Sequence, residues 1–275
     1  MLLDYAVAQG LCQDSVEARD KTVARLFGAI MPSPRDVRQQ FAKLLHKEGS
    51  QAAISWVYGL CRDNDYIRTE RIAQNIVYPA MTPAGELTVT INLSKPEKDP
   101  WDIAAAHHQA AVSYPKCMLC RENPGYVGWP GFPARQNHRI IPLTLGGGET
   151  WYLQYSPYLY YPEHCIVLNG QHVPILITRE SFEKMADFVD MFPHYFIGSN
   201  ADLPIVGGSI LTHDHFQGGQ HIFPWRRRTP GLTSGQMTPR CGGAALKWPM
   251  ICLRFTCQER GRADRSDDDG AQGLA

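Results

Sequence analysis

The sequence has no net charge and no long apolar run, and each absence excludes a class of protein. Its 27 Lys and Arg residues balance its 27 Asp and Glu residues, which excludes a generally basic nucleic-acid binder and an acidic, disordered chain. No stretch approaches the about 18–20 apolar residues that a membrane-spanning helix needs. Met1-Leu2-Leu3 is followed at once by Asp4, so no apolar segment of a signal peptide is present. We therefore expect a cytoplasmic, reducing setting, with no membrane and no nucleic acid as partner.

Closely spaced cysteines are also scarce, because Cys117 and Cys120 form the single C-x-x-C pair among the eight cysteines. In a reducing setting such a pair is more typical of metal binding than of a disulfide. It can hold one tetrahedral zinc ion, but two further ligands are required. Those ligands have to be histidines, and the candidates are His138, His164, His172, His213 and His221. Two buried free thiols and a redox pair are the alternatives, although a thioredoxin-like βαβ pattern is not evident.

Helical patterns dominate the first part of the chain, residues 1–113. Apolar residues recur at helical spacing in residues 23–30, 37–45, 52–61 and 101–112. Between the third and fourth of these segments, apolar residues alternate with Thr and Asn, which predicts a half-buried strand near residues 86–93. We therefore expect a helical N-terminal region that contains one strand.

The second part, residues 114–225, alternates short strand-like runs with turns. One helix is predicted over residues 179–191, with Thr178 as its N-cap. Strands are predicted near residues 139–145, 151–155, 165–168, 195–197 and 209–217. Strands joined by hairpins around one long helix indicate an antiparallel sheet in an α+β fold.

The last part, residues 226–275, differs in charge and composition. It carries 9 Lys and Arg against 5 Asp and Glu, a net charge of +4, whereas residues 1–225 carry 18 against 22, a net charge of −4. The neutral total is therefore the sum of a mildly acidic body and a basic ending. Residues 247–250 resemble ordered sequence, but Gly, Arg, Asp and Ser dominate the end of the chain, and beyond about Gln258 this composition indicates disorder. We therefore expect a largely disordered tail.

The run that carries most chemistry is His213-Asp-His215-Phe-Gln217, with Gly-Gly on both sides. Alternate residues of a strand share one face, so the two histidines and the glutamine are expected to project together. Two imidazoles and an amide on one face can bind a metal, attack phosphorus and hold a phosphate oxygen. A pair of histidines satisfied by hydrogen bonds on a sheet surface is the alternative. Asn137 and Asn200 lie at predicted strand edges, where Asn serves as a phosphate or ribose contact or simply as a turn former.

Several longer motifs give the sequence a specific resemblance to one family. The chain resembles the bacterial class II galactose-1-phosphate uridylyltransferases in five runs: Asn92-Leu-Ser-Lys-Pro-Glu-Lys-Asp-Pro100, Tyr114-Pro-Lys-Cys-Met-Leu-Cys120, Pro133-Ala-Arg-Gln-Asn-His-Arg-Ile-Ile-Pro-Leu-Thr144, Phe192-Pro-His-Tyr-Phe-Ile-Gly-Ser-Asn-Ala-Asp-Leu-Pro-Ile-Val206 and Ser209-Ile-Leu-Thr-His-Asp-His-Phe-Gln-Gly-Gly219. The resemblance covers about residues 1–225, with residues 247–250 as a further fragment. It implies a histidine-triad-like antiparallel sheet with a flanking helix, preceded by the helical region.

The resemblance also implies an activity and its residues. UDP-glucose and galactose 1-phosphate would exchange a uridylyl group through a uridylated histidine, in the Leloir pathway of galactose metabolism. By motif position His215 is the nucleophile and Gln217 holds the phosphoryl oxygens, while Asn200 and Ser209 resemble the family's phosphate and ribose contacts. A neutral imidazole suits this role, since its usual pKa of about 6.5 leaves a free nitrogen lone pair near neutral pH.

The resemblance further implies a structural zinc ion. Class I relatives hold zinc with two Cys and two His, one of which is the first His of the nucleophile motif. Carried over, these positions are Cys117, Cys120 and His213, with His172 as the fourth ligand and His164 as the runner-up. The expected partners are a UDP-sugar and a hexose 1-phosphate, and a homodimer is left open.

Length is the main departure from the family. Class II members are nearly twice as long as these 275 residues, and the sequence is expected to stop resembling them after Met250. The ending therefore suggests a C-terminal truncation or a tail read out of frame. A catalytically inactive metal-bound fragment and a histidine-triad-type nucleotide hydrolase are the alternative functions. A zinc-ribbon nucleic-acid binder is disfavoured, because it needs a second Cys pair and a basic face.

Overall fold

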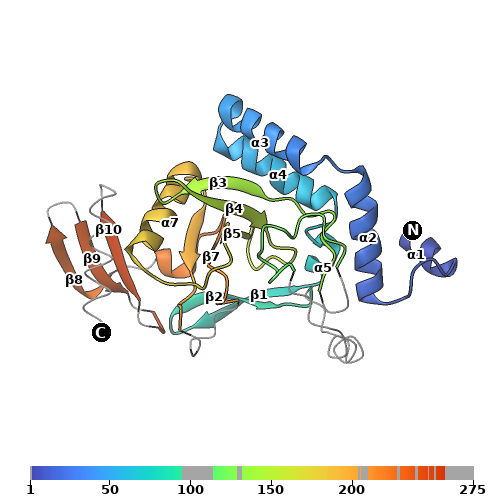
Figure 1. Cartoon of the computed structure of the whole chain (residues 1–275). Coiled ribbons are helices and arrows are strands. Elements are labelled where there is room, and N and C mark those ends of the chain that lie inside the picture. The colour runs from blue at the N-terminus through green and yellow to red at the C-terminus, as the bar shows by residue number, and fades with distance from the viewer. Residues whose placement is uncertain are drawn as a thin grey trace.

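The computed structural model describes residues 2–94, 114–128, 132–203, 205, 210–227, 230–238, 241–246, 248–250 and 252–257. The protein is an α+β protein whose sheets are all antiparallel in the described part of the chain (Figure 1). In chain order its elements are α1 (Leu2–Ala8), α2 (Val16–Ile30), α3 (Pro34–Glu48), α4 (Ser50–Asp63), α5 (Thr69–Ile72), β1 (Ile76–Thr82), β2 (Gly85–Ile91), β3 (Ile141–Leu145), β4 (Glu149–Tyr155), β5 (Cys165–Asn169), α7 (Arg179–Met191), β6 (Phe196–Ser199), β7 (His215–Gly219), the 3-10 helix η2 (Pro224–Arg227), β8 (Pro230–Thr238), β9 (Cys241–Leu246) and β10 (Leu253–Cys257).

The helices begin and end where local chemistry predicts. Ser33 caps α3 by accepting a hydrogen bond from the backbone N–H of Asp36, and Pro34 occupies the first turn, where no backbone donor is needed. Gly49 has φ 89° and lets the chain turn from α3 directly into α4. In α7, the Ser181 hydroxyl accepts a hydrogen bond from the backbone of Thr178. No helix in the described residues is long and apolar enough to span a membrane.

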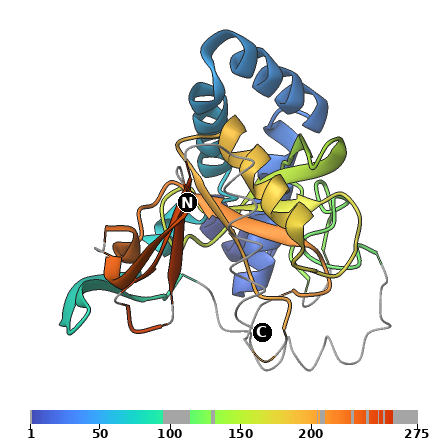
Figure 2. The same cartoon turned by 90° about the vertical axis from the view of Figure 1, so that its left-hand side faces the viewer.

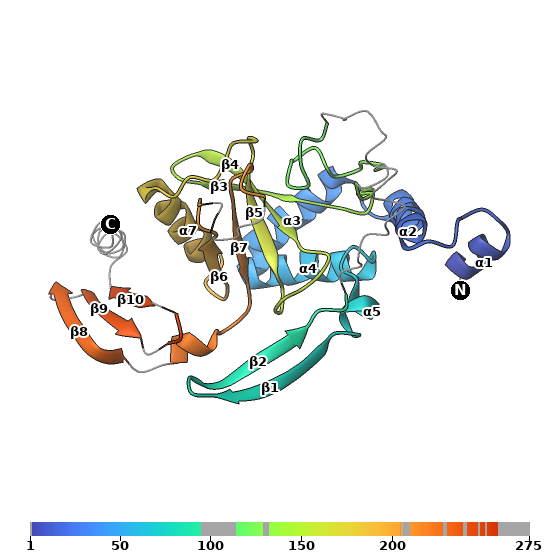
Figure 3. The ribbon, with the colours of Figure 1, turned by 90° about the horizontal axis from the view of Figure 1, so that it is seen from below.

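A five-stranded sheet in the order β3-β4-β5-β7-β6 forms the centre of the fold (Figure 3). Its strand β7 lies between β5 and β6, so that Gln217 pairs with Ile166 on one side and with Gly198 on the other. A central strand has both backbone edges hydrogen-bonded, which makes it a rigid support for functional side chains.

One face of this sheet packs into the core. Trp151 on β4 stacks on Phe216 of β7, with ring centroids 4.9 Å apart and planes 5° apart. The Tyr155 hydroxyl donates a hydrogen bond to the carbonyl of Ile54 on α4. Residues of α3, α4, α7 and the sheet form one continuous buried cluster, and Figure 2 shows α7 running beside the strands. The opposite face of β7 is therefore the one that carries His215 and Gln217.

Two smaller sheets flank the central one. Strands β1 and β2 form a hairpin, and β10, β9 and β8 form a three-stranded sheet (Figure 3). The part expected to be a largely disordered tail contains the strands β8, β9 and β10, all of which lie before Gln258, beyond which the composition indicates disorder. The sequence signal was weak in these strands, since Gly and Arg are not typical strand residues, and pairing of neighbouring segments decides the structure. Residues 258–275 lie outside the described residues.

Other predictions differ from the structure at element boundaries. The predicted strand over residues 209–217 begins only at His215, because Ile210 adopts a positive φ of 55° and the following residues form a turn. Strand β1 was missed, and it lies in the N-terminal region, residues 1–113, in which a single strand was expected. The helix predicted over residues 101–112 lies outside the described residues. The division into parts at residues 113 and 225 stays a prediction.

Candidate functional site

His215 is held at the start of β7 in a defined tautomer. The side chain is buried, and its Nδ1 lies 2.7 Å from the backbone carbonyl oxygen of His213. A carbonyl oxygen can only accept, so Nδ1 carries the ring proton and Nε2 keeps its lone pair. Burial lowers the pKa of His215, which favours this neutral form. The imidazole therefore presents a free nitrogen nucleophile on the face of the sheet away from the Trp151 stack.

Gln217 lies on the same face and connects two further polar side chains. Its Oε1 is 3.2 Å from Nε2 of His164, and its Nε2 is 3.4 Å from Oδ1 of Asn200. Burial lowers the pKa of His164. Gln217 on β7, His164 directly before β5 and Asn200 directly after β6 therefore meet on this face, next to His215.

The loop that carries His164 packs directly on the end of β7. The backbone N–H of Gln220 donates a hydrogen bond to the carbonyl of Pro162, at 3.1 Å. A Cβ atom at Gly219 would meet the carbonyl oxygens of Pro162 and Glu163 at 2.9 and 3.0 Å. This close approach therefore requires glycine at position 219.

Gly219→Ala is expected to lower the free energy of unfolding by about 1–3 kcal/mol, because the added methyl group displaces backbone atoms of the loop. Urea unfolding of the two proteins measures this change. Gly59→Ala on α4 is the matched control: its Cβ meets no atom within 4 Å outside the helix, so it should stabilise the protein by about 0.4–1 kcal/mol. Equal unfolding free energies for wild type and Gly219→Ala would contradict the packing argument.

A second group of side chains brings together two cysteines and two histidines. Cys117, Cys120, His172 and His213 place one ligand atom each within 4.8 Å of one another. The two Sγ atoms are 3.7 Å apart, Sγ of Cys117 is 3.2 Å from Nδ1 of His213, and Sγ of Cys120 is 3.3 Å from Nδ1 of His172. A tetrahedral zinc ion with ordinary bond lengths separates two sulfurs by about 3.8 Å and a sulfur from a nitrogen by about 3.6 Å. The donor set and its spacing therefore fit zinc.

Local structure orients these ligand atoms. In the Cys117–Cys120 turn, the backbone N–H of Leu119 points to the Sγ of Cys117 and that of Cys117 to the Sγ of Cys120, both at 3.3 Å. Nε2 of His213 donates to the carbonyl of Asn169 at 2.9 Å, which leaves the Nδ1 lone pair facing the sulfurs. Burial raises the pKa of the Cys117 thiol to about 12. Metal binding would therefore have to displace that proton.

The cluster joins three segments that are distant in sequence. The cysteine turn precedes β3, His172 follows β5, and His213 precedes β7 by two residues. A hollow of 260 Å³ borders the cluster and is lined by Cys120, His172 and His213 among others, which provides an entry path for an ion.

The other histidines lie elsewhere. His164, the runner-up ligand, contacts Gln217 instead, and His138 stacks on Tyr66 with its Nε2 3.0 Å from Gln154. His221 stacks on Tyr161. The contact of His164 with Gln217 was missed, because nothing in the sequence pairs two residues 53 positions apart.

The two asparagines singled out from the sequence have different environments. Asn137 is buried, and its amide N–H₂ donates to the carbonyl of Asn64 while the Asn64 amide donates to the carbonyl of Asn137. Its contacts are therefore structural. Asn200 lies against Gln217, as above. Ser209 lies outside the described residues.

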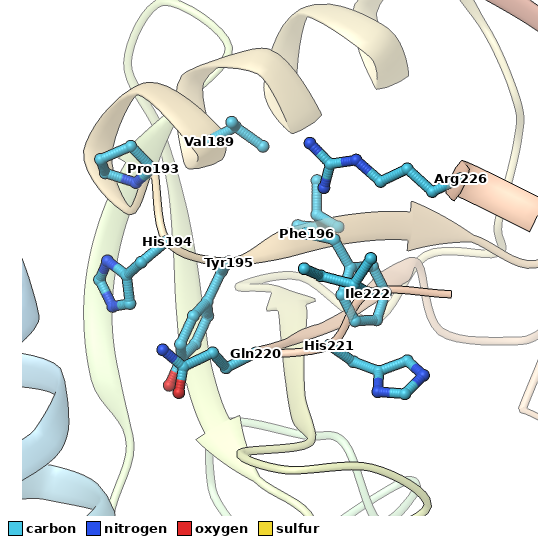
Figure 4. Close-up of a pocket in the computed structure, with 10 residues that line it drawn as sticks. Val189, Pro193, His194, Tyr195, Phe196, Gln220, His221, Ile222 and Arg226 are labelled. Carbon is cyan, nitrogen blue, oxygen red and sulfur yellow. The ribbon is translucent and has the colours of Figure 1, made fainter. Parts of the chain in front are cut away.

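A pocket of the described residues lies away from the two sites, and of the candidate residues only His221 lines it. It has a volume of 760 Å³ and lies beside β6, where its lining includes Tyr195, Phe196 and His221. Figure 4 shows Arg226 reaching over β6 toward Val189 and Pro193. Neither His215 nor Gln217 lines this pocket. The candidate site is therefore identified by the chemistry of its side chains and not by the volume of a pocket.

Together, the fold and the site define an α+β protein in which a central strand presents a neutral imidazole and an amide next to a Cys₂His₂ cluster. Residues 2–174 match the family model described as galactose-1-phosphate uridyl transferase, N-terminal domain. The chain belongs to this family.

Curated relatives extend the match along most of the chain. The galactose-1-phosphate uridylyltransferase of Bacillus subtilis is 48% identical over 265 residues, which cover 93% of this chain and 50% of the relative. Those of Butyrivibrio fibrisolvens and Caldanaerobacter subterraneus are each 47% identical, over 95% and 94% of this chain and 67% and 50% of the relative. The chain thus spans about half the length of most of these relatives. No solved structure gives a significant match.

The extent of the match corrects one prediction. The relative from Halalkalibacterium halodurans aligns over 97% of this chain, so the alignment reaches past Met250, where the resemblance was expected to stop. An alignment of that extent also includes residues 213–217, which the family model does not cover.

Proposed function

We propose that this chain transfers a uridylyl group between UDP-glucose and galactose 1-phosphate through a uridylated His215. One observation carries the proposal: the Nδ1 proton of His215 is held by the His213 carbonyl, which leaves Nε2 as a free nucleophile on the face that carries Gln217. The substrate class follows from the relatives, which are galactose-1-phosphate uridylyltransferases.

In the proposed first step, Nε2 of His215 attacks the α-phosphorus of UDP-glucose. The bond from that phosphorus to the bridging oxygen breaks, and glucose 1-phosphate leaves with the electron pair. The Nδ1 proton stays on the ring, where its hydrogen bond to the His213 carbonyl disperses the positive charge that develops. In the second step a phosphate oxygen of galactose 1-phosphate attacks the same phosphorus, and the P–N bond breaks to return the lone pair to Nε2.

Gln217 would stabilise the pentacoordinate phosphorus of the transition state in both steps. An amide N–H can donate to the non-bridging oxygens, where negative charge accumulates, and the amide does not itself become a leaving group. Asn200, 3.4 Å from the Gln217 amide, and Ser209 would contact the phosphate and the ribose.

Zinc would have a structural role in this proposal. Cys117, Cys120, His172 and His213 would hold the ion, and four protein ligands leave no open coordination position for chemistry. The ion would tie the turn before β7 to the cysteine turn and to the segment after β5. That connection fixes the backbone carbonyl of His213, which in turn orients His215.

The finer fold assignment belongs to the same proposal. An antiparallel five-stranded sheet with H-x-H-x-Q at the start of an inner strand supports a histidine-triad-like architecture. A homodimer stays a prediction.

The test is incubation of the folded chain with UDP-glucose that carries ³²P at the α-phosphate. We expect up to one acid-labile, base-stable label per chain, on the peptide that contains His215, and its transfer to galactose 1-phosphate as UDP-galactose. A folded, zinc-loaded chain that never acquires label would overturn the proposal. Release of the label into water as UMP, without need of a sugar phosphate, would favour the nucleotide hydrolase instead.

A further inference from the structure

His164 lies next to Gln217, and the two side chains form a hydrogen bond. Its imidazole is 2% exposed, and Nε2 is 3.2 Å from Oε1 of Gln217. Its other nitrogen, Nδ1, is buried and has no hydrogen-bond partner among the described residues. A buried N–H without an acceptor is costly, so the ring proton belongs on Nε2, where it donates to Gln217.

The ring is also held from its other sides. The side chains of Tyr160 and Tyr161 contact it, with ring centroids 5.3 and 4.7 Å away. The preceding residue, Glu163, has a positive φ of 55°, and its carboxylate accepts a hydrogen bond from the hydroxyl of Tyr195. Tyr195 is buried, and its hydroxyl is 2.9 Å from that of Tyr155 on β4. The loop is thus anchored to the core next to His164.

This arrangement selects one of two orientations of the Gln217 amide. A glutamine amide can rotate by 180° and exchange its oxygen with its nitrogen at little intrinsic cost. With the His164 N–H as donor, the oxygen faces His164 and the N–H₂ group faces the other way, toward Asn200. In the rotated amide, two donors would oppose each other at His164, which is unfavourable.

We propose that His164 is a positioning residue that keeps the N–H₂ group of Gln217 directed toward the transferred phosphoryl group. The inference rests on the proposed function for its catalytic consequence, but the orientation of the Gln217 amide is a property of the free protein. His164 itself does not touch the substrate and acts through Gln217.

The experiment compares three variants by the rate of ³²P labelling in a single turnover. His164→Leu removes the donor and is expected to slow labelling by about 10- to 100-fold, as for other residues that orient a reacting group. His164→Gln places an amide nitrogen near the position of Nε2 and should recover most of the rate. His221→Leu is the matched control, because His221 also stacks on Tyr161 and should change the rate less than about twofold.

A double-mutant cycle separates positioning from a merely structural role. If His164 acts through Gln217, His164→Leu has no further effect in a Gln217→Ala background. Additive rate losses with unchanged thermal unfolding would overturn the inference. So would an undiminished labelling rate in His164→Leu.

A readout without activity keeps the inference testable if the chain never becomes labelled. The side-chain amide N–H₂ signals of Gln217 in an ¹⁵N spectrum are assigned by their loss in Gln217→Met. We expect them to shift or broaden in His164→Leu and to stay unchanged in His221→Leu. Unmoved signals in His164→Leu would refute the positioning role, whereas a wild type without label and with moved signals would refute the proposed function alone.

Discussion

His215→Asn is expected to reduce uridylylation by about 10⁴-fold or more, which is the scale of losses when a covalent nucleophile is removed. The amide nitrogen of Asn occupies nearly the position of Nδ1, so the hydrogen bond to the His213 carbonyl can be kept. Nε2 is lost, and an amide nitrogen is not a nucleophile because its lone pair is delocalised. The substitution therefore removes the reacting atom and little else. Single-turnover labelling with α-³²P UDP-glucose measures the effect.

The controls distinguish lost chemistry from lost structure. His215→Asn should retain its zinc and unfold within about 2 kcal/mol of wild type, since one buried side chain changes and its hydrogen bond persists. His221→Asn, two residues beyond the end of β7, should label at the wild-type rate. Undiminished label in His215→Asn would show that another group, such as His164, accepts the uridylyl group, and the proposed role of His215 would be wrong.

Local patterns predicted the fold where each element carries its own signal. Helix α7 runs over residues 179–191 as predicted, because its apolar periodicity and the N-cap at Thr178 are both local. The antiparallel sheet was predicted from short alternating runs, and β3, β4, β5 and β6 lie within a few residues of their predicted positions. The hairpin strand β1 was missed because its Pro79 argues against a strand.

The site required more than local patterns. Motif resemblance supplied the four members of the Cys–His cluster, and the structure brings the same four together. Spacing alone could not choose between His172 and His164, since the choice depends on which loop folds back on the cysteine turn. The role of His164 arises from its tertiary contact with Gln217, and the tautomer of His215 arises from the turn before β7. Both depend on backbone positions that no residue type specifies.

Zinc is expected to bind the isolated chain at one ion per chain, and His172→Asn is expected to weaken that binding by roughly 100-fold or more. Structural zinc sites contribute about 10–16 kcal/mol in small peptides, which is about 3 kcal/mol for each of four ligands and corresponds to roughly a 100-fold change in affinity. Competition with a chelator of known zinc affinity measures the change. Because the cysteine thiols must lose protons when they bind zinc, the apparent affinity should rise with pH.

The decisive comparison is between His172 and His164. His164→Asn should keep wild-type zinc affinity, because its imidazole contacts Gln217 rather than the cysteines, and Cys12→Ser should keep it too, since Cys12 lies outside the cluster. Chelation should lower the unfolding temperature of wild type and of both control variants, but should change that of His172→Asn much less. Because a zinc ion at this cluster would also fix the turn before β7, its removal should slow labelling of His215 even at temperatures where the chain stays folded. Equal zinc affinity in His172→Asn and wild type would exclude His172 as a ligand. The proposed connection through zinc between the segment after β5 and the turn before His215 would then be wrong as well.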